Sequence, residues 1–192
     1  MIKIGITGGI GSGKSVISRI LRLLNYPVYD SDFWAKELMN NNPTIQQSLT
    51  ERFGPETYQN NTLNRPFLAQ QIFNNDDARL FVNSIVHPIV SQHFLDWTEN
   101  QNSELVFIES AILFSSGLDK IIDTTIFVDA PQQIRLQRVK LRDNSTETAI
   151  QARINSQKQE ESYAKEHSQF IIHNDNKQLL LPQITTIIKE LL

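Results

Sequence analysis

The fold class follows from one stretch near the N-terminus, Gly8-Gly9-Ile10-Gly11-Ser12-Gly13-Lys14-Ser15, which matches the phosphate-binding pattern GxxxxGK[ST] at every fixed position. Its glycines let the backbone curl so that successive N–H groups face one anion. A following helix adds its dipole and its free N–H groups. Lys14 can then reach the β- and γ-phosphates of a nucleotide, and the Ser15 hydroxyl can ligate Mg²⁺. We therefore predict a nucleotide-binding P-loop here.

The residues on either side have the periodicity that a P-loop requires. A β-branched run, Ile2 to Thr7, reads as a buried parallel strand. From Lys14 the period changes to that of an amphipathic helix, which Asn25 and Pro27 end. The apolar face expected for this helix comprises Val16, Ile17, Ile20, Leu21, Leu23 and Leu24. A strand before the loop and a helix after it argue against a glycine-rich turn that binds nothing.

The rest of the chain predicts an α/β fold with a parallel sheet, because further apolar runs alternate with helical patterns. These runs are Val28–Asp30, Leu105–Ile108, Thr124–Val128 and Phe170–Ile172. Between Asp30 and Leu105 we expect helices and no strand, with breaks at Asn40–Pro43 and Asn74–Asp77. This insertion is either a helical subdomain that covers a substrate or extra packing.

Composition excludes several classes of protein. The 192 residues fit one domain, and the net charge of −3 gives no support for a nucleic-acid surface. There is no cysteine, which excludes disulfides and thiol metal sites. No apolar run approaches the roughly 18 residues that span a membrane, and the N-terminus lacks a signal-peptide layout. We expect a cytoplasmic protein without nucleic-acid or membrane partners.

Acidic residues follow two of the predicted strands. Asp30 and Asp32 come after the second strand, where the carboxyl ends of parallel strands line a ligand crevice. One carboxylate could accept a proton from an acceptor hydroxyl while the other orders metal or water; alternatively, one of them caps the helix that begins near Phe33. Glu109 ends the run from Leu105 and has the position of a Walker-B acid, which orders Mg²⁺.

Three arginines follow Pro131 on a predicted helix: Arg135, Arg138 and Arg142. They could form a mobile lid that excludes water and neutralises the transferring phosphoryl group, or an ordinary solvated basic face. Arg153 on the next helix could join them. His87 precedes Pro88 within the insertion; the proline predicts a helix boundary or kink, and a lone histidine is more often a structural hydrogen bonder than a catalyst.

The P-loop alone does not distinguish kinases from other nucleotide hydrolases. A switch GTPase carries a base-reading NKxD motif, which Asn174-Asp175-Asn176-Lys177 does not match, and the LSGGQ of transporter ATPases is absent. The short chain, the helical insertion and the arginines favour a small-molecule kinase.

Nearly end to end, the sequence resembles the bacterial dephospho-coenzyme A kinases. The blocks that carry the resemblance are the opening strand with TGGIGSGKS, Asp30-Ser31-Asp32-Phe33-Trp34-Ala35, His87-Pro88, the segment from Glu109 to Leu118, Val128-Asp129, Arg138 to Asp143, Arg153-Ile154-Asn155-Ser156-Gln157 and Ile171-Ile172-His173-Asn174. The chain departs from the family pattern at Ala111, Ser115 and Val16, where proline, glutamate and threonine are usual; the change at Ser115 leaves open how the acceptor is bound.

The resemblance implies ATP- and Mg²⁺-dependent phosphorylation of the ribose 3′-hydroxyl of dephospho-coenzyme A, the last step of coenzyme A synthesis. It also implies a five-stranded parallel core at residues 1–30, 104–140 and 168–192, a helical acceptor-binding insertion at about 31–103 and a lid at about 141–157.

The implied roles are as follows. ATP would contact the P-loop from Gly8 to Val16, and its adenine would lie near Arg138 and Asn174. Lys14, Asp32 and Arg142 would act in phosphoryl transfer. Asp30, Asp32, His87 and Leu113 would bind the acceptor, and Ser15 and Glu109 would hold Mg²⁺. Two rival functions stay open: a kinase for shikimate, a sugar acid or a nucleoside monophosphate, and an ATP-binding regulatory module without transfer.

Overall fold

The strands predicted from the sequence form one parallel sheet in the computed structural model, which describes residues 1–73 and 75–192. Its order is β2 (Val28–Asp30), β5 (Leu105–Glu109), β1 (Ile2–Thr7), β6 (Thr124–Asp129) and β7 (Phe170–His173). All pairings within this sheet are parallel, which confirms the five-stranded α/β fold. The strands β5, β6 and β7 each run one residue beyond the predicted end.

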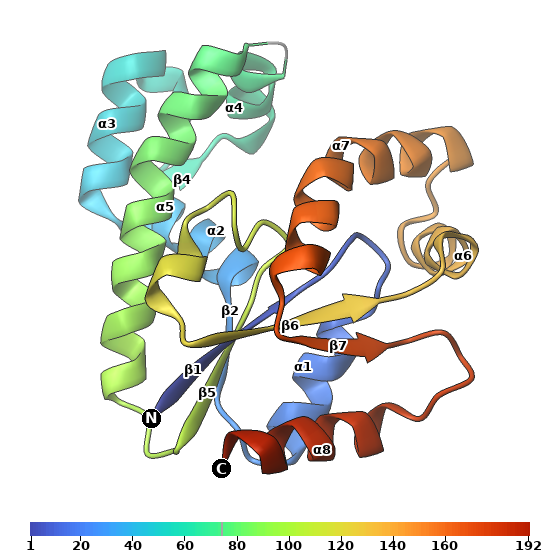
Figure 1. Cartoon of the computed structure of the whole chain (residues 1–192). Coiled ribbons are helices and arrows are strands. Elements are labelled where there is room, and N and C mark those ends of the chain that lie inside the picture. Colours follow the sequence, from blue (N-terminus) through green and yellow to red (C-terminus); the bar gives the residue numbers. More distant parts are fainter. Residues whose placement is uncertain (74) are drawn as a thin grey trace. The chain divides into compact units, whose positions relative to one another are not determined.

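The chain divides into two compact units, which are described separately. The core unit comprises Met1–Asp30 and Gln101–Leu192 and contains the parallel sheet; the helical unit comprises Ser31–Asn100. Figure 1 shows the elements of both units coloured along the sequence.

One face of the sheet packs against α1 (Lys14–Leu23) and α8 (Leu180–Leu191). Alternate strand residues point into this layer because side chains alternate across a strand. Within α1 the buried apolar residues are Ile17 and Leu21, whereas Val16, Leu23 and Leu24 are exposed. The predicted apolar face was therefore too wide, because only Ile17, Leu21 and the partly buried Ile20 pack against the core beneath the sheet.

The opposite face carries the segment after β5 together with α6 (Gln132–Asp143) and α7 (Glu147–His167). Gly5 lies between the two inward-pointing isoleucines of β1, and a Cβ there would come within 2.6 Å of Ile122 and 2.7 Å of Leu113. The helix α6 begins at Gln132, one residue after the predicted start, because Pro131 occupies the cap position in an extended conformation.

The helical unit consists mainly of α2 (Ser31–Asn41), α3 (Pro43–Phe53), α4 (Arg65–Ile72) and α5 (Asp76–Glu99). A short 3-10 turn, η1 (Pro55–Thr57), precedes a two-strand hairpin of β3 (Tyr58–Gln59) and β4 (Thr62–Leu63), so the expectation of no strand in this region was wrong. The first predicted break is confirmed, because the Asn42 side chain caps α3. Of the second predicted break, Asn74 lies outside the described residues; Asn75 caps α5.

The helix α5 continues through Pro88, so the predicted boundary at this proline was wrong. Its buried residues recur every fourth position on both sides of the proline: Ala78, Val82, Val86, Val90, Phe94 and Thr98. Pro88 itself is exposed. The buried stripe therefore outweighs the lost backbone hydrogen bond, as tertiary packing stabilises most helices. Among the described helices, none has both the length and the apolar run needed to cross a membrane.

Candidate active site

The carboxyl ends of the parallel strands bring the predicted acids of the core unit together. Asp30 ends β2 and lies directly opposite Glu109, the last residue of β5. Glu109 in turn lies opposite Ile6 of β1, one residue before Thr7 and the P-loop. This edge of the sheet therefore places two carboxylates beside the start of the P-loop, as strand ends in a parallel sheet predict.

The glycines of the P-loop adopt backbone conformations that other residues rarely reach. Gly8, Gly11 and Gly13 have φ values of 147°, 75° and 98°. Gly13 precedes α1, which begins without a side-chain cap and without an acidic residue in its first turn. An uncapped N-terminus with no negative charge of its own suits an anion, because its N–H groups and dipole are left to the ligand.

Three glycines of the P-loop, Gly9, Gly11 and Gly13, are packed too closely against their neighbours to carry a side chain. A Cβ at Gly9 would collide with the Arg135 guanidinium and the Glu161 carboxylate, and one at Gly13 would collide with the Asn174 amide. A Cβ at Gly11 would lie 2.7 Å from the Arg135 carbonyl oxygen. The loop is thus a bare-backbone cradle supported from behind, which fits the phosphates of a nucleotide.

Lys14 folds back over this cradle. Its Nζ donates hydrogen bonds to the carbonyl oxygens of Gly8 at 2.7 Å and Gly9 at 3.3 Å. A cation held against the loop is in position to neutralise phosphate oxygens. The predicted P-loop lysine therefore has the geometry that phosphate binding requires.

Glu109 has an electrostatic environment suited to a cation. Burial raises the pKa of its carboxyl above the ordinary value, and the charge of Asp30 adds to the rise; a hydrogen bond with Ser18 and the charges of Lys14 and Arg22 oppose it. Carboxylate oxygens are ligands that Mg²⁺ prefers in proteins. The described residues contain no cluster of three or more His, Cys, Asp or Glu that could hold a metal ion.

Arg138 and Asn174 form a hydrogen-bonded unit behind the loop. The Arg138 guanidinium donates to the Ser12 carbonyl at 3.3 Å, to the Asn174 side chain at 3.0 Å and to the Asn176 side chain at 2.7 Å. Asn174 also donates from Nδ2 to the Ser12 carbonyl at 2.8 Å and is buried. Burial lowers the pKa of Arg138, although an arginine stays charged at neutral pH. Both residues predicted to lie near adenine are therefore brought together beside the P-loop.

Arg142 is held differently. Its guanidinium makes an ion pair with the neighbouring Asp143 at 2.6 Å, and Arg153 of α7 binds the same carboxylate at 2.9 Å. Hydrogen bonds from these two arginines lower the pKa of Asp143 to about 2. The predicted association of Arg153 with the lid arginines thus takes the form of a shared carboxylate at the turn between α6 and α7.

Arg135 was expected among the exposed lid arginines, and this expectation was wrong. Its side chain is buried in an ion pair with Glu161 of α7. The signal that could have revealed it is spacing: Arg135 lies four residues before the buried Val139 on the same face of α6. Sequence reasoning also missed Gln157 as a contact of the loop; its Oε1 accepts from the Ile10 N–H at 2.9 Å.

The remaining predicted residues lie away from the loop in sequence. Leu113 is fully buried and packs against Gly5, so in this conformation its side chain serves the core. Asp32 lies in the first turn of α2, and His87 lies on α5; both belong to the helical unit. Burial lowers the pKa of His87, which favours the neutral imidazole.

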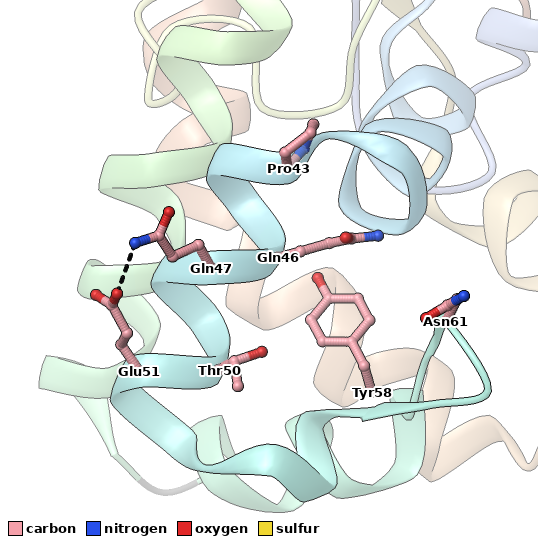
Figure 2. A pocket seen from close by; sticks show the side chains of 7 residues that line it. All are labelled: Pro43, Gln46, Gln47, Thr50, Glu51, Tyr58 and Asn61. Atoms are coloured by element: carbon pink, nitrogen blue, oxygen red, sulfur yellow. Dashed lines mark hydrogen bonds between the residues drawn. The ribbon is translucent and has the colours of Figure 1, made fainter.

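The helical unit has a polar pocket of its own, of about 420 Å³, beside α3. Figure 2 shows Tyr58 and Asn61 facing this helix, with Gln47 bonded to Glu51 at 2.8 Å. The Tyr58 hydroxyl donates to the Met39 carbonyl at 2.7 Å, and burial raises its pKa to about 12. The tyrosine therefore stays neutral at physiological pH.

The raised pKa of Glu109 predicts that replacing this residue raises thermal stability near neutral pH but lowers activity. A carboxyl whose pKa rises on folding contributes stability that is present below its ordinary pKa and is lost as the pH rises through the raised value. Glu109→Gln should therefore increase Tm near neutral pH without Mg²⁺, and this gain should vanish below about pH 4. Meanwhile kcat with Mg²⁺ and ATP should fall about tenfold or more. Thermal melts over a pH series, paired with kinetics, check both; an unchanged Tm at neutral pH would contradict the assigned burial cost.

Comparison with known proteins identifies the family. The family model described as dephospho-CoA kinase matches residues 2–179. A protein of Porphyromonas gingivalis named dephospho-CoA kinase is 48% identical over 189 residues, covering 98% of this chain and 94% of that protein. A Bacteroides fragilis protein of the same name is 39% identical over 188 residues, covering 97% of this chain and 91% of that protein.

Solved structures agree in fold. A Thermus thermophilus protein, TT1252, superposes with a TM-score of 0.83 at 29% identity, covering 100% of this chain and 98% of that one. A dephospho-CoA kinase of Campylobacter jejuni shares the fold with a TM-score of 0.69 at 24% identity, covering 98% of this chain and 96% of that one. A shikimate kinase of Bacteroides thetaiotaomicron also shares the fold, with a TM-score of 0.58 at 14% identity, covering 99% of this chain and 98% of that one. The match over residues 2–179 is decisive: the chain belongs to the dephospho-CoA kinase family.

Proposed function

We propose that the chain transfers the γ-phosphoryl group of ATP to the 3′-hydroxyl of the ribose of dephospho-coenzyme A, giving coenzyme A and ADP. The observation that carries this function is the intact phosphate cradle, with Lys14 and Glu109 beside it, in a chain whose family match spans residues 2–179. A regulatory module without transfer would not need this arrangement of cation and carboxylates. The fold shared with shikimate kinases does not by itself extend to their substrate.

The nucleotide is assigned to the core unit. Its phosphates would lie on the backbone of residues 8–16, with Lys14 on the β- and γ-oxygens. Adenine would lie near Arg138 and Asn174, whose mutual hydrogen bonds pre-organise that wall. Ser15 and Glu109 would hold Mg²⁺, which would supply positive charge to neutralise the phosphate oxygens.

The transfer itself needs an oxygen nucleophile and a place for its proton. The ribose 3′-oxygen attacks the γ-phosphorus, the bond from that phosphorus to the bridging oxygen of ADP breaks, and the hydroxyl proton passes to a carboxylate. We assign this carboxylate to Asp32, with Asp30 as an acceptor contact. Lys14 and Arg142 would neutralise the charge that the transition state spreads over the phosphoryl oxygens.

The acceptor is assigned to the helical unit, with His87 and Asp32 as contacts. Leu113 would contact the acceptor only after a rearrangement of the segment that follows β5, because its side chain is buried. Residues 141–157 would form the lid. Arg142 would then exchange Asp143 for phosphate oxygens when the lid closes. We place the protein in the cytoplasm, with ATP and dephospho-coenzyme A as its partners and without nucleic acid or membrane.

An acceptor panel tests the function. Purified protein with ATP and Mg²⁺ should phosphorylate dephospho-coenzyme A faster than shikimate, gluconate or a nucleoside monophosphate, with the product identified by mass spectrometry. Lys14→Ala serves as the control for contaminating kinases, because loss of one preorganised cation should lower kcat about 100-fold or more. Faster turnover of any rival acceptor would overturn the assignment.

The choice of base is tested by paired amide variants. Asp32→Asn keeps the size of the side chain but removes its proton-accepting capacity, so kcat should fall while the KM for the acceptor stays within a few-fold. Asp30→Asn should raise that KM instead. Steady-state kinetics on both variants distinguishes the roles, and a loss of kcat confined to Asp30→Asn would reverse them.

The arginines of α6 should separate by role. Arg138→Lys loses the planar fork that bonds Ser12 and Asn174, so the KM for ATP should rise with little change in kcat. Arg142→Lys should mainly lower kcat, because its phosphate contacts would form only as the lid closes. Kinetics with varied ATP measures both effects. Wild-type behaviour of Arg142→Lys would remove Arg142 from the transfer step.

A further inference from the structure

Ile10, the third residue of the P-loop, is held by α6 and α7 through its side chain and through both polar groups of its backbone. The side chain is buried in a small apolar cluster with Val139 of α6 and with Ile150 and Ile154 of α7. The backbone N–H donates to Gln157 Oε1 at 2.9 Å. The backbone carbonyl accepts from Arg135 Nε at 2.8 Å.

The arginine in this contact is itself fixed. Arg135 is only 5% exposed, and its Nη1 forms an ion pair with Glu161 of α7. A buried guanidinium is costly unless it is paired, so the carboxylate determines where the Nε–H points. Gly9 lies directly over this ion pair, since a Cβ there would collide with both partners.

Because the peptide bond is planar, these contacts fix the orientation of peptide groups in the loop. In a trans peptide the N–H and the preceding C=O point in opposite directions. Holding the Ile10 N–H toward Gln157 therefore aims the Gly9 carbonyl the other way, where it accepts from Ser12 N at 3.1 Å and from Lys14 Nζ at 3.3 Å.

The next peptide plane obeys the same geometry. Arg135 holds the Ile10 carbonyl on the α6 side of the loop, so the Gly11 N–H of the same peptide is aimed away from Arg135. Anion binding by a P-loop depends on N–H groups that converge on one point. Rotation of the second plane would turn the Gly11 N–H and replace it with the Ile10 carbonyl, and rotation of the first would break the hydrogen bonds of the Gly9 carbonyl to Ser12 N and Lys14 Nζ, which position the loop and its lysine.

We infer that Gln157, Arg135 and Glu161 are positioning residues, which set two peptide planes of the P-loop for phosphate binding without touching the nucleotide. Gln157 is also the last residue of the proposed lid, so the lid is anchored to the P-loop at this end. This inference requires only that the P-loop bind nucleotide, and it does not depend on which acceptor is phosphorylated.

Gln157→Ala isolates the first contact. It removes the acceptor of the Ile10 N–H and leaves the apolar cluster and the ion pair in place. The Kd for ADP, measured by titration calorimetry without acceptor, should rise about tenfold, as should the KM for ATP. The KM for the acceptor and the Tm should stay close to wild type, which a general structural defect would not allow.

Gln159→Ala is the matched control, because it makes the same truncation on the same helix at an exposed side chain. Its ADP affinity should equal that of the wild type. Glu161 provides an independent pair of variants: Glu161→Gln keeps an oxygen that accepts from Arg135 and should bind ADP nearly as the wild type does, whereas Glu161→Ala should weaken binding.

The inference is overturned if Gln157→Ala binds ADP as tightly as the wild type, or no more weakly than Gln159→Ala. It is also overturned if the KM values for ATP and for the acceptor rise together. A chain that binds ADP as predicted but phosphorylates a different acceptor would overturn the proposed function and leave the role of Gln157 intact.

Discussion

The close approach of the P-loop backbone to the residues behind it is the constraint on which the core unit depends. Gly9 lies on the Arg135–Glu161 ion pair, Gly11 on the backbone of α6 and Gly13 on the Asn174 amide. The absence of a side chain at these three glycines lets α6, α7 and Asn174 support the loop, and the positive φ values of Gly11 and Gly13 let the chain curl. A phosphate site made of backbone N–H groups can be rigid only if something holds those groups, and here the holding residues come from far along the chain.

The strand ends add charge to this rigid cradle. Parallel pairing in register puts Asp30 directly beside Glu109, and burial raises the pKa of Glu109 in spite of the nearby Lys14. Two carboxylates held side by side cost stability in the free protein. A divalent cation at this edge would relieve that cost, which is the physical reason why the proposed function places Mg²⁺ there.

The arginines that look alike in the sequence serve different purposes because they lie at different levels along α6. Arg135 faces inward and pairs with Glu161; Arg138 reaches the Ser12 carbonyl and Asn174; Arg142 lies near the end of the helix and pairs with Asp143. At about 100° per residue these positions lie within about 60° of one another around the helix, so the rise of about 1.5 Å per residue, and not rotation, separates their environments. A contiguous basic segment is thus divided into a support for the loop, a hydrogen-bonded unit beside it and a more exposed ion pair at the end of the helix.

The sequence by itself determined the parallel α/β fold, the P-loop and the family, because these depend on local patterns: the glycine spacing before Lys14, and apolar runs alternating with helical periods. It also placed Glu109 and Asp30 at strand ends, which parallel pairing then brought together. Only the tertiary structure decided the burial of Arg135, the contact of Gln157 with Ile10 and the continuation of α5 through Pro88. Each of these depends on a partner at least one helical turn away, and for Ile10 and Gln157 that partner is 147 residues away. Periodicity in a single segment shows which face is apolar but cannot show what that face, or a polar group on it, will meet.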